Sequence, residues 1–276
     1  MPRSRSMQLL LTALLALALA ACGGGSEATP TASPAPASTA APTLTATLRP
    51  ASTSTPQPPA PTSPPATGRA QVVSRGPEGR NAVALTFDAG ADTGFAGTIL
   101  DILRNEGVSA SFGMTGRWAE ANPALLRRIV DEGHELINHT YDHTSFTGLS
   151  TGSAPLSRDE RWAELDRTEE IVLGVGGASS KPYFRPPFGD YDDSVLDDVG
   201  ARGYAYSVMW TVDSRGWQGR SADEIVEICL SGAAPGAIYI FHVGSESQDA
   251  AALPRVIASL RDQGYAFVTI SELLGH

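Results

Sequence analysis

From about residue 80 to its C-terminus, this 276-residue chain alternates short apolar runs with stretches of helical periodicity, and this alternation limits the folds open to it. Apolar runs separated by helices are typical of parallel strands, because each helix returns the chain to the starting end of the sheet. We therefore expect one α/β domain whose parallel sheet is open or closed into a barrel. The seven expected strands are Ala82–Phe87, Ala110–Met114, Glu135–Asn138, Tyr183–Arg185, Ala205–Trp210, Ala237–Phe241 and Ala266–Thr269.

Capping residues mark where several of the intervening helices begin. Ser157 with Glu160, and Ser221 with Glu224, have the spacing of capping boxes, in which each side chain satisfies a backbone N–H at the helix start. The expected helices are Phe95–Asn105, one opening at Asn122-Pro123, Arg161–Leu173, Ser194–Arg202, Ser221–Leu230 and Pro254–Gln263.

Polar residues follow five of the expected strands directly, and in parallel sheets chemistry gathers at the carboxyl ends of strands. Each alone has an ordinary explanation, such as a turn aspartate, a salt-bridge arginine or a core histidine. Five at the same end of one sheet indicate a functional site. They are Asp88, the segment His139–His143, Arg185, Asp213 and His242.

Three of the chain's five histidines lie within ten residues, and two of them, His139 and His143, are four positions apart. On a helical turn these two would share one face with Cβ atoms roughly 6 Å apart. That spacing suits two imidazoles that bind one divalent cation, as in zinc hydrolases, although two surface histidines without a ligand have the same pattern.

The N-terminal residues have the pattern of a secretion signal. Arg3 and Arg5 precede an apolar run over Leu9–Ala21, which at thirteen residues is too short to span a bilayer. Small residues before Cys22 resemble the bacterial lipobox, so we expect residues 1–22 to be a lipoprotein signal peptide and the mature protein to be anchored outside the cytoplasm through lipid on Cys22. An ordinary signal peptide is the alternative. Cys229 then has no disulfide partner and is expected to be a buried apolar residue.

Residues 23–79 are expected to be a disordered linker, because this stretch is dominated by Ala, Thr, Ser and Pro and has few large apolar residues. The globular domain is then residues 80–276. Residues 1–80 contain six Arg and two Glu, which leaves 14 Lys+Arg against 28 Asp+Glu beyond them, a formal net charge of −14. Such a surface is a poor partner for nucleic acid and suits a neutral substrate.

Over Ala82–Ser271 the chain resembles the polysaccharide deacetylase family, the carbohydrate esterases with a NodB-like domain. Five motifs carry the resemblance, in family order. They are Thr86–Gly90 (family TFDDG), His139–His143 (H(S/T)xxH), Arg185–Gly189 (Arg-x-Pro, aromatic, glycine), Trp210–Trp217 (DxxDW) and Ile238–His242, a strand that ends in histidine. The resemblance implies a deformed parallel (β/α) barrel.

The resemblance also implies metal-assisted removal of acetyl groups from amino sugars. His139 and His143 would hold the cation, with Zn²⁺ the expected ion and Co²⁺ an alternative. Asp88 would be the general base, oriented by Arg185, and His242 the acid that protonates the leaving amine.

The resemblance implies a substrate site as well. The backbone N–H after Pro187, which belongs to Phe188, would stabilise the oxyanion. Trp217 and Ile240 would form the slot for the acetyl methyl group.

Two positions depart from the family motifs. The second aspartate of the first motif, a metal ligand, is Ala89 here, and we predict that Asp92 supplies the missing carboxylate; the alternative is that Asp92 caps the next helix. The aspartate that tunes the catalytic histidine in the fourth motif is Gly216, and Asp213 is the candidate to replace it.

These features favour an envelope deacetylase, expected to be monomeric, that acts on N-acetylated glycans such as peptidoglycan or chitin-like oligosaccharides. An esterase that removes O-acetyl groups from xylan is an alternative, since water attacks an acetyl carbonyl in both reactions. A non-catalytic glycan-binding lipoprotein is a third reading, in which Ala89 and Gly216 mark a decayed site.

Overall fold

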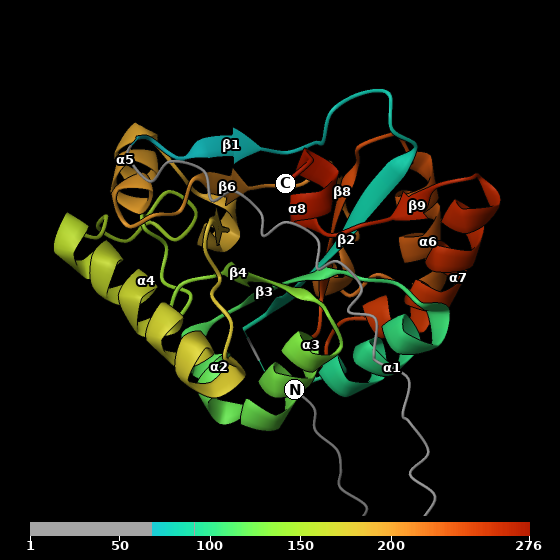
Figure 1. The fold of residues 1–276 in the computed structure, drawn as a ribbon, viewed down its shortest axis with the longest axis horizontal. Helices are drawn as coiled ribbons and strands as arrows, with labels where there is room; N and C mark the ends of the chain where they lie inside the picture. The colour runs from blue at the N-terminus through green and yellow to red at the C-terminus, as the bar shows by residue number, and fades with distance from the viewer. Residues whose placement is uncertain (1–67, 91) are drawn as a thin grey trace, which may run out of the picture. The chain divides into compact units, whose positions relative to one another are not determined.

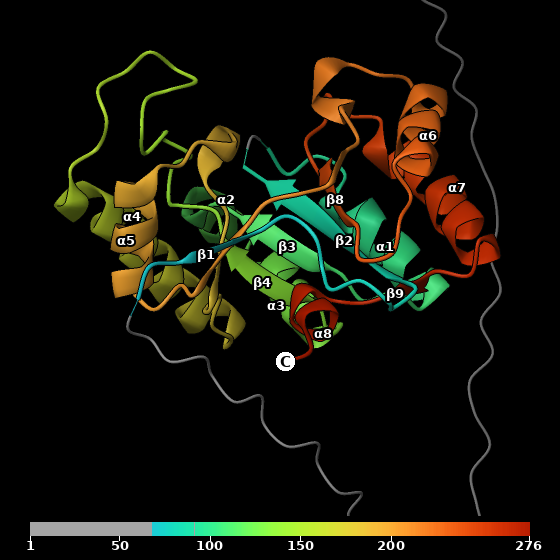
Figure 2. The ribbon, with the colours of Figure 1, turned by 90° about the horizontal axis from the view of Figure 1, so that it is seen from above.

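The computed structural model describes residues 68–90 and 92–276, which form a nine-stranded sheet whose strands pair in parallel. The strand order is β1-β6-β5-β4-β3-β2-β8-β7, and β9 also pairs with β2. Within the described residues no pairing joins the edge strands β1 and β7, so the sheet is a curled half-barrel, which Figure 2 shows from above. The strands are β1 (Gln71–Val73), β2 (Ala82–Ala89), β3 (Ser111–Met114), β4 (Glu135–Asn138), β5 (Tyr183–Phe184), β6 (Tyr206–Val208), β7 (Val212–Asp213), β8 (Ile238–His242) and β9 (Ala266–Phe267).

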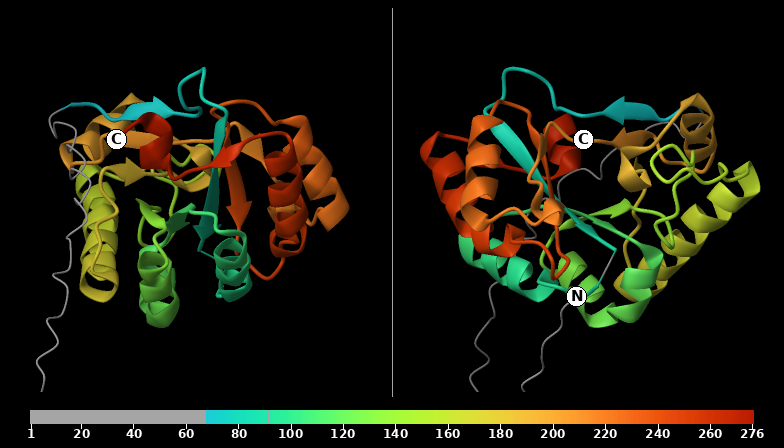
Figure 3. Two further views of the ribbon diagram at one scale, coloured as in Figure 1. Left: turned by 45° about the vertical axis from the view of Figure 1, so that its right-hand side comes forward. Right: turned by 180° about the vertical axis from the view of Figure 1, so that it is seen from behind.

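Most of the helices surround the sheet on its outer side, from α4 and α5 at one end to α6 and α7 at the other (Figures 1 and 3). They are α1 (Ala96–Glu106), α2 (Gly116–Ala121), α3 (Pro123–Asp131), α4 (Arg158–Ile171), α5 (Asp193–Ala201), α6 (Ala222–Ser231), α7 (Asp249–Asp262) and α8 (Ile270–Leu274). A π-helical turn (Val172–Gly176) extends α4, and 3-10 turns lie at Pro187–Gly189 and Gly216–Gln218. No helix in the described part of the chain is both long and apolar enough to cross a membrane.

The apolar core lies between the sheet and these helices. Phe87 of β2 stacks on Phe112 and Phe241 of the neighbouring strands, with ring centroids 5.2 and 5.4 Å apart. All eight residues of β2 are buried, as expected for a central parallel strand covered on both faces. Cys229 is buried in this core, as predicted. The packed strands hold their carboxyl ends at one edge of the sheet.

The structure confirms the predicted fold class and all seven predicted strands. The two capping boxes at Ser157 and Ser221 are also confirmed, and Gly107 ends α1 in the left-handed conformation with φ 62°. Two further strands, β1 and β7, have only three and two residues, too few for a periodic pattern to reveal them.

Two predicted boundaries are wrong. Gln71–Val73 pairs with β6, so the folded part begins before residue 80 and the predicted linker does not extend to residue 79. Helix α7 begins at Asp249 rather than at Pro254, which lies inside the helix. The predicted signal peptide, Cys22 and the linker up to residue 67 lie outside the described residues.

Candidate active site

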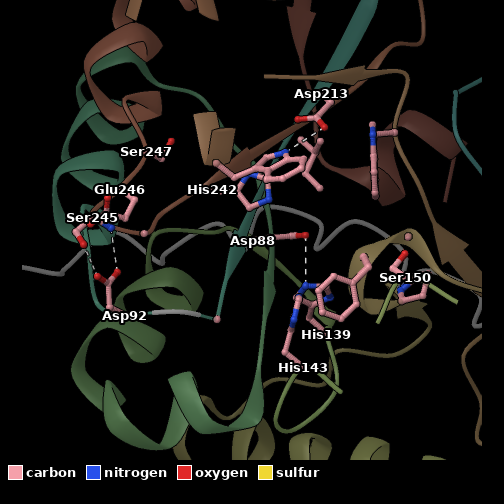
Figure 4. A pocket seen from close by; sticks show the side chains of 18 residues that line it. Asp88, Asp92, His139, His143, Ser150, Asp213, His242, Ser245, Glu246 and Ser247 are labelled. Atoms are coloured by element: carbon pink, nitrogen blue, oxygen red, sulfur yellow. Dashed lines mark hydrogen bonds and ion pairs between the residues drawn. The ribbon is translucent and has the colours of Figure 1, made fainter. Parts of the chain in front are cut away.

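The carboxyl ends of β2, β4, β5, β7 and β8 bring the five polar strand-end motifs together. In the sheet, Asp88 of β2 is paired with His242 of β8, and Asp213 of β7 is paired with Ile240 of β8. Their side chains surround a cavity of about 650 Å³ (Figure 4). Nine of the eleven predicted site residues line it, namely Asp88, Asp92, His139, His143, Phe188, Asp213, Trp217, Ile240 and His242.

The two remaining predicted residues lie behind the cavity wall. Arg185 is completely buried beneath Asp88, and Pro187 is buried in its 3-10 turn while its neighbour Pro186 lines the cavity. Two aromatic side chains at the rim are open to solvent: Trp217 is 57% exposed and Phe188 is 50% exposed. The cavity therefore has a polar floor and an aromatic rim.

Asp88 and Arg185 form an ion pair on the cavity floor. Arg185 Nη1 donates to Asp88 Oδ1 at 2.7 Å, and Arg185 Nε donates to the carbonyl of Val208 at 2.9 Å. A Cβ on Gly113 would lie 2.5 Å from Asp88 Oδ1, so only glycine at position 113 leaves room for the pair. Burial disfavours the ionised carboxylate, but Arg185 and the neighbouring His139 and His242 together outweigh it and lower the pKa of Asp88 below its ordinary value.

His139 and His143 meet in a loop and not on the helical turn that their spacing had implied. The segment after β4 has no helical backbone, and Thr140 and His143 have positive φ angles of 65° and 68°. The two imidazole rings nevertheless meet edge to face, with centroids 4.7 Å apart. The two imidazoles are therefore brought together by a loop with positive φ angles and not by a helix.

Hydrogen bonding leaves the histidine pair suited to a cation. His139 Nδ1 lies 2.9 Å from the carbonyl oxygen of Arg185, which can only accept a hydrogen bond, so Nδ1 carries the proton and Nε2 keeps its lone pair. That Nε2 lies 3.5 Å from Asp88 Oδ2. Burial lowers the pKa of His139 and lowers that of His143 to about 4, and neutral imidazole is the form that binds metal. The chemistry of these two donors fits a divalent cation.

The structure does not bring Asp92 to the histidine pair. Its carboxylate accepts hydrogen bonds from the backbone N–H of Ser245 at 3.0 Å and from the Ser245 hydroxyl, on the opposite side of the cavity (Figure 4). Ala89 is buried and contributes no ligand. Among residues 68–90 and 92–276 no cluster of three or more His, Cys, Asp or Glu side chains is arranged to hold a metal ion.

Replacement of Asp92 by alanine is therefore expected to leave the affinity for Zn²⁺ unchanged, because its carboxylate is hydrogen-bonded to Ser245 and not directed at the histidines. Titration calorimetry with Zn²⁺ measures this directly, with His143→Ala as the positive control that loses affinity. A loss for Asp92→Ala as large as that for His143→Ala would show that the loop turns this carboxylate toward the histidines.

One acidic residue bonded to His242 could not be identified from the sequence pattern. Asp249, the first residue of α7, accepts a hydrogen bond from the backbone N–H of His242 at 2.7 Å. Asp213 instead accepts from the N–H of Arg215 at 2.8 Å and from the Trp217 indole at 3.3 Å. The three alanines after Asp249 are strong helix formers and would have indicated the earlier start of α7.

Backbone strain is concentrated around the cavity. Four non-glycine residues in the described part of the chain have positive φ, and they are Thr140, His143, Phe188 and Arg215. They lie in the loops that follow β4, β5 and β7. Because such conformations cost free energy, their gathering at one edge is typical of a functional site.

The curled parallel sheet, with carboxylates and imidazoles gathered at its carboxyl edge, defines an α/β protein with a strand-end site. The profile of the polysaccharide deacetylase family matches residues 75–207. The chain is 35% identical over 201 residues to a peptidoglycan-N-acetylglucosamine deacetylase of Bacillus cereus, covering 72% of this chain and 70% of that protein. It belongs to the polysaccharide deacetylase family.

Solved structures give the same assignment. One of a peptidoglycan N-acetylglucosamine deacetylase aligns with a TM-score of 0.67 at 32% identity, covering 74% of this chain and 92% of that one. A pseudoenzyme of carbohydrate esterase family 4 from Bacillus anthracis aligns with a TM-score of 0.66 at 30% identity, covering 74% and 69%. The fold is therefore shared by active and inactive members, and activity has to be argued from the side chains of this chain.

Proposed function

We propose that this protein is a metal-dependent deacetylase that releases acetate from N-acetylated amino-sugar polymers of the cell envelope. The observation that carries the proposal is the convergence of Asp88, the His139–His143 pair and His242 on one cavity floor, with Arg185 buried beneath. These groups are a base, a cation site and an acid, the three functions of metal-assisted amide hydrolysis.

Asp88 is the base in this proposal. Arg185 holds Oδ1, so Oδ2 is the oxygen that takes a proton from the attacking water. The lowered pKa keeps the carboxylate ionised at neutral pH. His242, on the neighbouring strand, donates a proton to the amine as the C–N bond breaks.

His139 and His143 would hold the cation. When bound, a divalent ion such as Zn²⁺, or Co²⁺ in its place, would polarise the acetamide carbonyl and make a nearby water more acidic. The hydrogen bond from His139 Nδ1 to the carbonyl of Arg185 fixes the ring orientation and its tautomer.

The apolar wall of the cavity supports binding of an acetylated sugar. Trp217 and Ile240 line the cavity and offer a slot for the acetyl methyl group. Phe188, half exposed at the rim, offers a face on which a sugar ring can stack. The N–H of Phe188, which follows Pro187, is the proposed oxyanion donor.

The choice of substrate rests on charge and on relatives. The net charge of −14 beyond residue 80 favours a neutral glycan over an anionic polymer. The Bacillus cereus relative is named for N-acetylglucosamine of peptidoglycan, which supports an N-acetylated substrate here. We further propose that the protein is a monomer tethered to the membrane through lipidated Cys22, which would give the domain access to the envelope.

The proposal is tested by measuring acetate release from N-acetylglucosamine oligomers, peptidoglycan and acetylxylan, each with and without chelator. We expect release from the N-acetylated substrates, loss of release with chelator and recovery on addition of Zn²⁺. Faster release from acetylxylan would favour an O-acetyl esterase. No release from any substrate, with glycan binding intact, would contradict an enzymatic function and place this chain beside the family's pseudoenzymes.

A further inference from the structure

The space that a side chain at position 216 would occupy is already filled. A Cβ added to Gly216 would lie 2.6 Å from Asp249 Oδ1 and 2.2 Å from the Ser247 hydroxyl oxygen. The fourth motif has glycine where an aspartate is expected, and a carboxylate from another element stands at that place. Asp249 reaches it from the first turn of α7, 33 residues further along the chain.

Asp249 ties three elements of the site together. It is completely buried, and its Oδ2 accepts hydrogen bonds from the His242 N–H at 2.7 Å and from the Ser214 hydroxyl at 3.1 Å. The end of β8, the loop after β7 and the start of α7 are thereby joined at one carboxylate. This arrangement fixes the backbone from which the His242 imidazole projects.

Asp249 and His242 each have one buried side-chain atom without a hydrogen-bond partner within the described residues. These atoms are Asp249 Oδ1 and His242 Nδ1. Burial raises the pKa of Asp249, while the His242 N–H, the Ser214 and Ser247 hydroxyls and the charge of His242 act in the opposite direction. The carboxylate and the imidazole therefore interact electrostatically, although the structure records no hydrogen bond between them.

We propose that Asp249 is the positioning residue of His242, replacing the aspartate that is absent at Gly216. It orients the imidazole through the backbone N–H of His242 and places a carboxylate beside the ring. Such a group favours the protonated imidazole that must deliver a proton to the leaving amine. Asp213 is not available for this role, because its carboxylate is held by Arg215 and Trp217. The inference rests on the proposed deacetylase function.

The test compares two substrates that differ in their leaving group. The amine of an N-acetylated sugar leaves only when it receives a proton, whereas the phenolate of 4-nitrophenyl acetate leaves without one. Replacement of Asp249 by asparagine keeps an acceptor for the His242 N–H and removes the charge. We expect kcat on N-acetylglucosamine oligomers to fall by about 10–100-fold with KM little changed. Hydrolysis of 4-nitrophenyl acetate is expected to stay at the wild-type rate.

A double-mutant cycle shows whether Asp249 acts through His242. Asp249→Asn is expected to have no further effect on amide turnover in a His242→Ala background, because residues that act as a unit are not additive. Ser214→Ala, which removes one hydrogen bond to Asp249, is expected to show the same substrate pattern with a smaller loss. This variant keeps the test available where Asp249→Asn fails to fold. Asp262→Asn, at the exposed end of the same helix, is the matched control.

Equal losses on both substrates, or a full additional loss in the His242→Ala background, would assign Asp249 a purely structural role and overturn the inference. Wild-type rates for Asp249→Asn on the oligomers would also overturn it. These outcomes are separate from failure of the proposed function, in which the wild-type protein itself releases no acetate.

Discussion

Replacement of Asp88 by asparagine is expected to lower the rate of acetate release by about 10²–10⁴-fold while cation binding stays intact. The asparagine oxygen can still accept the hydrogen bond from Arg185 Nη1, so the local geometry is kept. The amide cannot accept a proton from water, because it is not basic at neutral pH. The loss of rate therefore measures the contribution of proton transfer to Asp88, because the geometry of the site is unchanged.

Acetate release and Zn²⁺ titration on the same preparation measure the two halves of this prediction. His139 and His143 are unchanged in the variant, so we expect the wild-type affinity for Zn²⁺. Asp262→Asn, an exposed substitution at the end of α7, serves as the control with wild-type activity. Retention of turnover by Asp88→Asn would exclude this carboxylate as the base.

Features that depend on residues close together in the sequence could be predicted. Strands such as Ala82–Ala89 are evident from local apolar runs, and the capping boxes at Ser157 and Ser221 from residues three apart. The rule that parallel strands align their carboxyl ends then places Asp88 beside His242, although they are 154 residues apart. The floor of the site was therefore predictable.

Loop geometry was not predictable in the same way. The His139–His143 pair was expected on a helical turn, but the rings meet because Thr140 and His143 adopt positive φ, which no periodic pattern signals. Asp92 lies in a loop whose partner, Ser245, belongs to a loop more than 150 residues away. The role of Asp249 depended on the true start of α7, which Pro254 concealed. None of these placements follows from local periodicity, and those of Asp92 and Asp249 depend on bonds to residues of other elements.

The largest effect on stability is expected from replacement of Arg185 by methionine. Arg185 is 0% exposed, and it donates both to Asp88 and to the carbonyl of Val208. Methionine keeps much of the apolar stem but leaves the Asp88 carboxylate buried without a partner. Removal of one member of a buried ion pair costs about 3–5 kcal/mol of the free energy of unfolding. For a domain of this size that lowers Tm by roughly 6–20 °C.

Thermal unfolding of three further variants tests whether the buried charge is the cause. Arg220→Met removes the exposed Arg220–Glu224 pair at the start of α6 and is expected to cost less than about 1 kcal/mol. Asp88→Asn combined with Arg185→Met is expected to be more stable than Arg185→Met alone, because the uncompensated carboxylate is gone. Asp88→Asn alone gives the fourth corner of the cycle. Two outcomes would contradict a stabilising role for the Asp88–Arg185 pair. One is that Arg185→Met is no less stable than Arg220→Met. The other is that the losses in free energy of unfolding for Asp88→Asn and Arg185→Met add in the double variant.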